Sequence, residues 1–254
     1  MNDLFTLQGR TALVTGGSRG IGRMIAAGFL AAGARVYISA RKADACDRAA
    51  TELSAIGPCV SLPADVSTTE GIQSLVAAYA KHESQLDILV NNAGAAWGAP
   101  YDEFPETGWD KVVDLNLKAP FFLTQALSAP LRRAAQFRPA KVINIASIDG
   151  VSVNPMETYS YAASKAGLIH LTKRMSLRLI QDNIVVSAIA PGAFASDMNR
   201  DARDHAPEVA ARVPAGRIGL DDDMAGAAIY LASRAGDYVV GATLVVDGGV
   251  TLSR

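Results

Sequence analysis

Short apolar runs alternate with longer alanine-rich stretches along the whole chain, and this alternation limits its fold more than any other feature. Six runs have the length and apolar character of buried strands: residues 10–15, 35–39, 86–90, 141–145, 184–189 and 243–246. Residues 59–62 are a weaker seventh candidate. Crossover helices fit between them, for example at residues 21–32, 43–56 and 69–82. Apolar strands joined by helices predict an α/β fold, a Rossmann-type doubly wound parallel sheet flanked by helices on both faces.

No linker, low-complexity tract or internal repeat divides the sequence, so we expect one domain over residues 1–254. The net charge of -1 offers no basic field to nucleic acid or an anionic membrane. The two cysteines, Cys46 and Cys59, are too few for a disulfide scaffold and fit no metal-ligand spacing, so no metal is expected. The sequence shows no secretory signal and no uncharged run long enough for a membrane span. A cytoplasmic location with reduced thiols is therefore predicted.

A glycine-rich turn follows the first strand. Ligands of open α/β sheets bind beyond the carboxyl ends of the strands, and the stretch Thr15-Gly-Gly-Ser-Arg-Gly-Ile-Gly22 lies at such an end and opens into a helix. Glycines let the backbone approach a pyrophosphate, whose charge meets amides at the helix N-terminus. We predict dinucleotide binding here, with an ordinary tight turn as the alternative. The candidate residues are Gly16, Ser18, Arg19, Gly20, Ile21 and Gly22.

The end of the second strand indicates which dinucleotide binds. A site selective for NAD usually places an acidic residue there to accept from the ribose 2′-hydroxyl. Here the stretch is Ser39-Ala-Arg-Lys42, with no acid before Asp44. The guanidinium groups of Arg41 and Arg19 suit a 2′-phosphate, which favours NADP(H). The alternative is that Arg41 is only a solvated residue after a strand.

Short polar residues and a glycine follow the next two strands. Asp65 and Val66 come after the weak third strand, and Asn92, Ala93 and Gly94 come after the fourth. They suit an adenine contact and a loop packed close to the cofactor, although each motif alone could be an ordinary turn.

Four residues form a candidate catalytic group. Tyr161 and Lys165 are four apart in a helical stretch that runs to about residue 180, so they share one helix face. A nearby ammonium favours the phenolate, so we expect the pKa of Tyr161 to fall toward neutral pH. Ser147 follows the fifth strand, where its hydroxyl could hold a substrate carbonyl oxygen. Asn116 is the fourth member.

Pro120 lies four residues after Asn116 and has no amide hydrogen. The helical hydrogen bond to the Asn116 carbonyl cannot form, so we predict a local break in the helix. The carbonyl could then hold a water that links Lys165 to solvent and returns a proton to Tyr161 after each turnover.

Together these motifs resemble the short-chain dehydrogenase/reductase family. They occur in the family's order over nearly the whole chain, and they include Asn91-Asn-Ala-Gly94 and Val246-Asp-Gly-Gly249. The resemblance implies a catalytic tetrad of Asn116, Ser147, Tyr161 and Lys165, with Tyr161 and Lys165 also contacting the nicotinamide ribose. It further implies cofactor contacts at Pro191, Gly192 and Ser196, the last in place of a threonine, and a homotetramer formed through long helices. Val185-Val-Ser187 departs from the family's usual Arg-Val-Asn without touching the tetrad.

The substrate is less constrained. Residues 194–216 follow the sixth strand and are the expected lid. Their arginines Arg200, Arg203 and Arg212 suit an anionic or phosphopantetheine-bearing substrate, or are simply solvated. Within the family the chain resembles bacterial 3-oxoacyl (β-ketoacyl) reductases of the rhamnolipid-associated type, which implies NADPH-dependent reduction of a 3-oxoacyl thioester. The alternatives are a sugar-acid enzyme such as a gluconate 5-dehydrogenase, and a non-catalytic sensor or scaffold that binds NADP(H).

Overall fold

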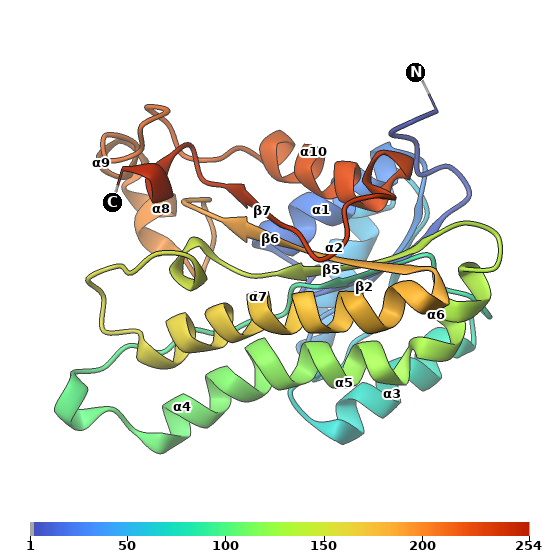
Figure 1. The fold of residues 1–254 in the computed structure, drawn as a ribbon, viewed down its shortest axis with the longest axis horizontal. Helices are drawn as coiled ribbons and strands as arrows, with labels where there is room; N and C mark the ends of the chain where they lie inside the picture. Colours follow the sequence, from blue (N-terminus) through green and yellow to red (C-terminus); the bar gives the residue numbers. More distant parts are fainter. Residues whose placement is uncertain (1–2, 254) are drawn as a thin grey trace.

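Seven parallel strands form one sheet in the computed structural model, which describes residues 3–253 (Figure 1). The predicted α/β fold with a doubly wound parallel sheet is confirmed. The strand order is β3-β2-β1-β4-β5-β6-β7. The strands are β1 (Thr11–Thr15), β2 (Arg35–Ser39), β3 (Cys59–Ser61), β4 (Ile88–Asn91), β5 (Ala140–Ile145), β6 (Ile184–Pro191) and β7 (Thr243–Val246). The first two residues and the last of the expected domain lie outside the described residues.

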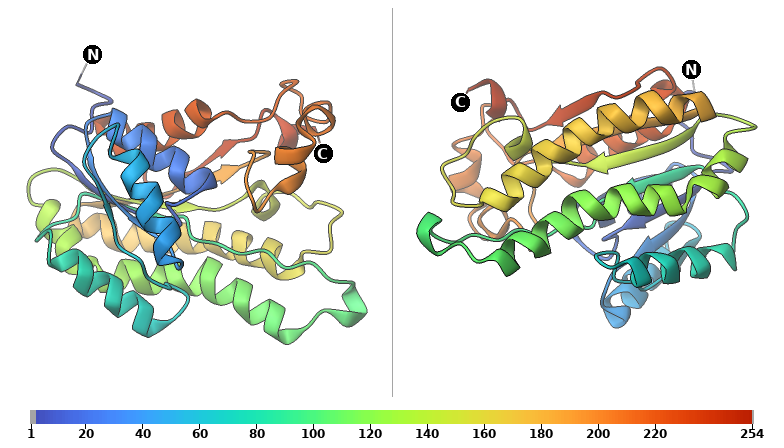
Figure 2. Two further views of the ribbon diagram at one scale, coloured as in Figure 1. Left: turned by 180° about the vertical axis from the view of Figure 1, so that it is seen from behind. Right: turned by 60° about the horizontal axis from the view of Figure 1, so that its bottom comes forward.

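Helices cover both faces of the sheet, as Figure 2 shows. One face carries α1 (Gly20–Ala31), α2 (Ala43–Leu53) and α10 (Asp221–Ala232). The other face carries α3 (Thr69–Ala80), α5 (Ala119–Ala126), α6 (Ser128–Ala134) and α7 (Tyr159–Leu179), with α4 (Glu106–Val113) leading into α5. Two short helices, α8 (Arg200–Asp204) and α9 (Ala206–Ala210), follow β6. No helix of the described chain combines the length and apolar character needed to cross a bilayer.

Alternate residues of a strand pack into two hydrophobic cores, one on each face of the sheet. On β1, Val14 packs with Phe29 of α1, whereas Leu13 packs with Tyr79 of α3 and Leu123 of α5. A strand with both faces buried must be apolar throughout, which explains the unbroken apolar runs in the sequence.

The observed bounds differ from the expected ones by a few residues. Helix α2 ends at Leu53 rather than near residue 56, because Gly57 and Pro58 follow and the residue before a proline disfavours helical geometry. Strand β6 continues to Pro191, two residues beyond the expectation, because it pairs with β7 up to Val246.

The chain order reverses between the neighbouring strands β1 and β4, which run parallel. Connections leave these two strands in opposite directions, and this opens a crevice beyond their carboxyl ends where open α/β sheets bind ligands. The residues at this carboxyl edge are therefore the first place to search for a site.

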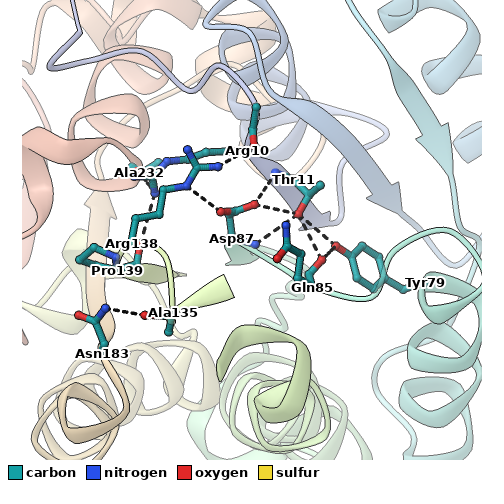
Figure 3. Close-up of polar contacts among 11 residues, drawn as sticks. Arg10, Thr11, Tyr79, Gln85, Asp87, Ala135, Arg138, Pro139, Asn183 and Ala232 are labelled. Atoms are coloured by element: carbon teal, nitrogen blue, oxygen red, sulfur yellow. Dashed lines mark hydrogen bonds and ion pairs between the residues drawn. The ribbon is translucent and has the colours of Figure 1, made fainter. Parts of the chain in front are cut away.

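The opposite, amino edge of the sheet is closed by a buried polar network (Figure 3). The Asp87 carboxylate, before β4, accepts hydrogen bonds from the Thr11 amide at 2.9 Å and from Arg138 Nε at 3.0 Å. Arg10 donates to the carbonyl of Ala232 at 3.1 Å, which joins the end of α10 to the start of β1. Each buried charge here has fixed partners, so the network fastens the strand starts together.

Candidate active site

The four residues predicted to be catalytic lie on three neighbouring elements at the carboxyl edge of the sheet. Ser147 follows β5, Tyr161 and Lys165 lie in the first two turns of α7, and Asn116 lies between α4 and α5. Asn116, Ser147 and Lys165 are buried, and Tyr161 is partly exposed. The structure brings all four into one region.

Lys165 is a buried cation without a carboxylate partner among the described residues. Its Nζ donates to the Ile145 carbonyl at 2.7 Å and lies 5.6 Å from the centroid of the Tyr161 ring. Burial lowers the pKa of Lys165 to about 8. The ammonium is therefore held over the ring face by a carbonyl at the end of β5.

The expectation that Lys165 would lower the pKa of Tyr161 is wrong for this arrangement of the protein alone. Burial of the phenol, opposed in part by a hydrogen bond from Ser147 and supported by the nearby Asp149 carboxylate, raises the pKa of Tyr161 to about 12. The physical reason is that the lysine lies over the ring, while desolvation acts on the hydroxyl itself. The Tyr161 phenol consequently holds its proton firmly.

Asn116 lies in a π-helical turn, Asp114–Lys118, between α4 and α5. Its side chain accepts from the Ala95 amide at 2.9 Å and donates to the Ala95 carbonyl at 2.9 Å. The same amide group donates to Ser164 on α7. These bonds hold the loop after β4 against α7. The helix is interrupted just before Pro120, where the sequence predicted a break, and π-turns of this kind are frequent at functional sites.

Ser147 begins a one-turn 3₁₀ helix, Ile148–Gly150, and its Oγ accepts from the Asp149 amide at 3.1 Å. Its hydroxyl also forms a hydrogen bond with Tyr161. A side chain at Gly150 would place its Cβ 2.6 Å from the Lys165 carbonyl carbon, so only glycine lets this turn pack directly on α7. Ser147 is thereby fixed relative to Tyr161 and Lys165.

The glycine-rich turn forms a close-fitting entry to α1. Gly16 and Gly20 have φ values of +65° and +52°, which favour glycine. A Cβ at Gly22 would lie 2.3 Å from the Gly16 carbonyl oxygen. Within the described residues no acidic side chain lies in the first turn of α1, and the N-cap Arg19 makes no capping hydrogen bond. A helix N-terminus left uncapped beside such a cradle fits a pyrophosphate. Ser18 and Ile21 lie in the same turn, partly buried.

The loop after β4 is fastened to the glycine turn. Thr15 Oγ1 accepts from the Asn92 and Ala93 amides, both at 3.0 Å. Asn92 Nδ2 donates to the Thr15 carbonyl at 2.8 Å, and a Cβ at Gly94 would lie 3.2 Å from Asn116 Oδ1. The cofactor turn and the catalytic residues are thus parts of one assembly.

The two arginines assigned to the cofactor already have acidic neighbours. Arg19 NH1 lies 2.5 Å from Asp197 Oδ2, and Arg41 NH1 lies 3.9 Å from Asp65 Oδ2. All four side chains are substantially exposed, so these pairs contribute little to stability. Both cations can therefore exchange partners at small cost.

The remaining cofactor candidates lie on the β3 and β6 ends. Asp65 accepts from the Ser67 amide at 3.1 Å and its neighbour Val66 is buried. After β6, the Gly192 amide donates to Val246 on β7, and Pro191 is the last residue of β6. A Cβ at Gly20 would lie 3.2 Å from Ser196 Cβ, so the segment after β6 reaches the glycine turn.

Sequence reasoning assigned no role of their own to several residues that shape the site. Asn91 donates to Asn144 Oδ1 at 2.8 Å, and Asn144 donates to Thr172 at 2.9 Å, a buried ladder across β4, β5 and α7. The only sequence signal was the unusual presence of asparagine in two apolar strands. Asp149 and Asp197 were also missed, since their partners are decided by tertiary contacts.

The sequence is similar to those of known oxidoreductases. A family model described as enoyl-(acyl carrier protein) reductase matches residues 16–251. The rhamnolipids biosynthesis 3-oxoacyl-[acyl-carrier-protein] reductase of Pseudomonas aeruginosa is 46% identical over 99% of this chain and 100% of that protein. The gluconate 5-dehydrogenase of Gluconobacter oxydans is 36% identical over 99% of this chain and 98% of that protein.

The fold has close counterparts among solved structures. The Pseudomonas aeruginosa RhlG/NADP active-site complex superposes with a TM-score of 0.95 at 46% identity, over 99% of this chain and 100% of the other. The chain therefore belongs to the short-chain dehydrogenase/reductase family of oxidoreductases, as the order of its motifs predicted.

Proposed function

We propose that this protein reduces a ketone to a secondary alcohol with NADPH, and that its substrate is a 3-oxoacyl thioester, converted to the 3-hydroxyacyl form. One observation carries the proposal. Lys165, a buried cation without a carboxylate partner among the described residues, lies over the ring of Tyr161 beside Ser147, next to a glycine turn that fits a pyrophosphate. Burying a charge without a counter-charge costs free energy, so the presence of the buried Lys165 ammonium indicates a role in catalysis.

Each member of the tetrad has one role in this proposal. A reduced nicotinamide supplies the hydride when it is bound. Ser147 donates a hydrogen bond to the substrate carbonyl oxygen, and Tyr161 gives that oxygen its proton as negative charge develops. Lys165 stabilises the phenolate that remains. The Asn116 carbonyl holds a water through which a proton returns to Tyr161.

The proposal assigns cofactor contacts to the residues of the glycine turn and the strand ends already described, and the 2′-phosphate to Arg19 and Arg41. The end of β2 offers two cations nearby and no acid before Asp44, which supports NADP(H). The relative from Pseudomonas aeruginosa was solved as an NADP complex, which agrees with this choice.

Exposed apolar side chains in the segments that follow Ser147 and β6 support an acyl substrate over a sugar acid. Val151, Val153 and Met156 follow the Ser147 turn and are half or more exposed, and Met198 of the proposed lid is also half exposed. Such residues suit an alkyl chain, whereas a polyol needs hydrogen-bond partners. The 3-oxoacyl reductase relative agrees, and the gluconate 5-dehydrogenase relative keeps the sugar-acid alternative testable.

The proposal includes one domain, a lid over residues 194–216 and a homotetramer. The long helices leave apolar side chains partly uncovered, among them Phe121 and Phe122 on α5 and Leu177 on α7. Exposed apolar residues gathered on helices are typical of subunit interfaces. Sedimentation of the purified protein would test the tetramer.

A steady-state assay tests the function. NADPH and NADH oxidation would be measured with acetoacetyl thioesters, longer 3-oxoacyl thioesters and 5-ketogluconate. The proposal predicts NADPH-dependent turnover of the thioesters. Turnover confined to the keto-sugar would move the enzyme to sugar-acid chemistry, a preference for NADH would remove the role of Arg19 and Arg41, and cofactor binding without turnover would favour the sensor alternative.

A further inference from the structure

A carboxylate in the segment after β6 holds one of the two arginines to which the 2′-phosphate is assigned. Asp197 Oδ2 accepts a hydrogen bond from a guanidinium nitrogen of Arg19 at 2.5 Å, although the two residues are 178 positions apart in the chain. Arg19 is the last residue before α1, and Asp197 lies in the proposed lid between β6 and α8. The ion pair therefore joins two segments that are both proposed to contact the cofactor.

Asp197 has a second cationic partner within its own segment. Its other carboxylate oxygen, Oδ1, lies 2.7 Å from a guanidinium nitrogen of Arg203 on α8. Ser196 Oγ accepts from the Asn199 amide at 3.1 Å, and the Asn199 side chain caps α8, so the turn that carries Asp197 has hydrogen bonds of its own. Asp197 consequently keeps an ion pair and its position in the turn when Arg19 leaves.

The pair between Arg19 and Asp197 is open to exchange. The two side chains are 73% and 46% exposed, so neither charge becomes a buried, unpaired group when the pair opens. A phosphate monoester carries nearly two negative charges at neutral pH, against one on a carboxylate, and it also offers more acceptor oxygens. The 2′-phosphate of NADPH can therefore displace Asp197 from Arg19, whereas the 2′-hydroxyl of NADH cannot.

We propose that Asp197 is a specificity-determining residue that lowers the selectivity for NADPH over NADH, because it competes with the 2′-phosphate for Arg19. This inference rests on the proposed function, which assigns the 2′-phosphate to Arg19 and Arg41. In the free protein Asp197 occupies the guanidinium group, so only molecules with an open pair offer Arg19 to the phosphate. The apparent affinity for NADPH falls with that fraction. NADH does not use this contact and is not affected by the competition.

Arg41 is held much less firmly by its own acidic neighbour. Its guanidinium lies 3.9 Å from Asp65 Oδ2, and Asp65 Oδ1 already accepts from the amide and the hydroxyl of Ser67, at 3.1 and 2.6 Å. Arg41 can therefore reach a 2′-phosphate without first breaking a close ion pair. The competition is specific to Arg19, which is the arginine whose partner comes from the proposed lid.

The test measures the dissociation constants of NADPH and NADH by fluorescence titration. In Asp197→Asn the NADH constant divided by the NADPH constant should rise by about two- to fivefold, the range expected for loss of an exposed competing ion pair. Asp201→Asn removes the same charge from the exposed surface of α8 in the same lid and should leave this ratio unchanged. An unchanged ratio in Asp197→Asn, or an equal rise in Asp201→Asn, would overturn the inference.

A double-mutant cycle shows whether Asp197 acts through Arg19. In the Arg19→Gln background, Asp197→Asn should no longer change the ratio, because the guanidinium for which the two anions compete is absent. A rise of the same size in that background would mean that Asp197 repels the phosphate directly, and it would contradict the inference.

The single variant Arg19→Gln separates this inference from the proposed function. It should lower the ratio, because a contact to the 2′-phosphate is lost. A ratio that stays at the wild-type value would remove the assignment of the 2′-phosphate to Arg19, and the inference with it. A lower ratio in Arg19→Gln beside an unchanged ratio in Asp197→Asn would overturn the inference alone and leave the cofactor assignment standing.

Discussion

The two edges of the sheet bury charged side chains in opposite ways. At the amino edge, Asp87 accepts from Arg138 and from a backbone amide, and Lys141 Nζ lies 2.7 Å from Asp237 Oδ1. At the carboxyl edge, Lys165 is equally buried but has a carbonyl and a phenol ring as neighbours, with no carboxylate partner among the described residues.

This difference indicates that the two edges of the sheet have different roles, one in stability and the other in catalysis. Burial lowers the pKa of Lys141 as well, but the hydrogen bond to Asp237 opposes this shift, so the pair can hold strands in register. A buried charge without a counter-charge is held in a state that a small change can shift, which is what proton transfer requires. The amino edge should therefore control folding, and the carboxyl edge should control turnover. The predictions below test this division, from the largest expected effect to the smallest.

Asp87→Asn should destabilise the protein by about 3–5 kcal/mol, because it removes the buried carboxylate that offsets the buried Arg10 charge and that accepts from the partly exposed Arg138. Urea unfolding measures the loss, and activity per folded molecule should be unchanged. Glu52→Gln, which breaks an exposed pair with Arg23, is the control and should cost about 1 kcal/mol or less. Equal losses in the two variants would contradict a special role for the amino edge.

Arg41→Ala should weaken NADPH binding by about 10- to 100-fold and leave NADH binding nearly unchanged, because a charge-assisted bond to the 2′-phosphate is lost. Fluorescence titration with both cofactors measures the two affinities. Lys42→Ala removes the adjacent exposed cation and should have a smaller effect. Parallel losses for both cofactors would show that Arg41 does not read the 2′-phosphate.

Lys165→Met should change stability in a way that depends on pH. The pKa of Lys165 is about 8 in the folded protein, below the usual value of about 10.4. Between these values the unfolded chain binds more protons, so wild-type stability rises with pH, and below pH 8 the full penalty of the buried charge remains. The variant lacks this penalty.

Relative to wild type, Lys165→Met should therefore be more favoured at pH 7 than at pH 10, by about 2 kcal/mol in the free energy of unfolding. Urea unfolding at the two pH values measures it. A stability difference that is the same at both would mean that the lysine is not held as an uncompensated charge.

Pro120→Ala should have the smallest effect, a rate reduced by about tenfold or less, because general acid–base steps supply only part of the catalysis. The new amide at residue 120 can donate to the Asn116 carbonyl and compete with the relay water. Pro130→Ala on α6 is the matched control. A structure of Pro120→Ala with the π-helical turn unchanged would show that the proline is not its cause.

The sequence was sufficient for the fold and for the positions of the site residues, because both follow from local patterns. Apolar strands between helices define a doubly wound sheet, and Ser147, Tyr161 and Lys165 stand at fixed offsets from strand and helix ends. The assignment of roles to these residues remains a proposal.

Contacts between residues far apart in the chain could not be predicted from the sequence. Asp87 meets Thr11 across 76 positions, and Arg19 meets Asp197 across 178. The pKa of Tyr161 was predicted in the wrong direction because helix spacing gives a neighbour but neither its height above the ring nor the extent of burial.

The most direct test of the whole account is the turnover of Tyr161→Phe on acetoacetyl thioester with NADPH, measured beside its NADPH affinity and its urea unfolding curve. The account predicts a loss of about a thousandfold in kcat/KM, with cofactor affinity and stability close to wild type, because the change removes one proton donor and keeps the ring. A variant that retains most of its rate would contradict the assignment of chemistry to the carboxyl edge.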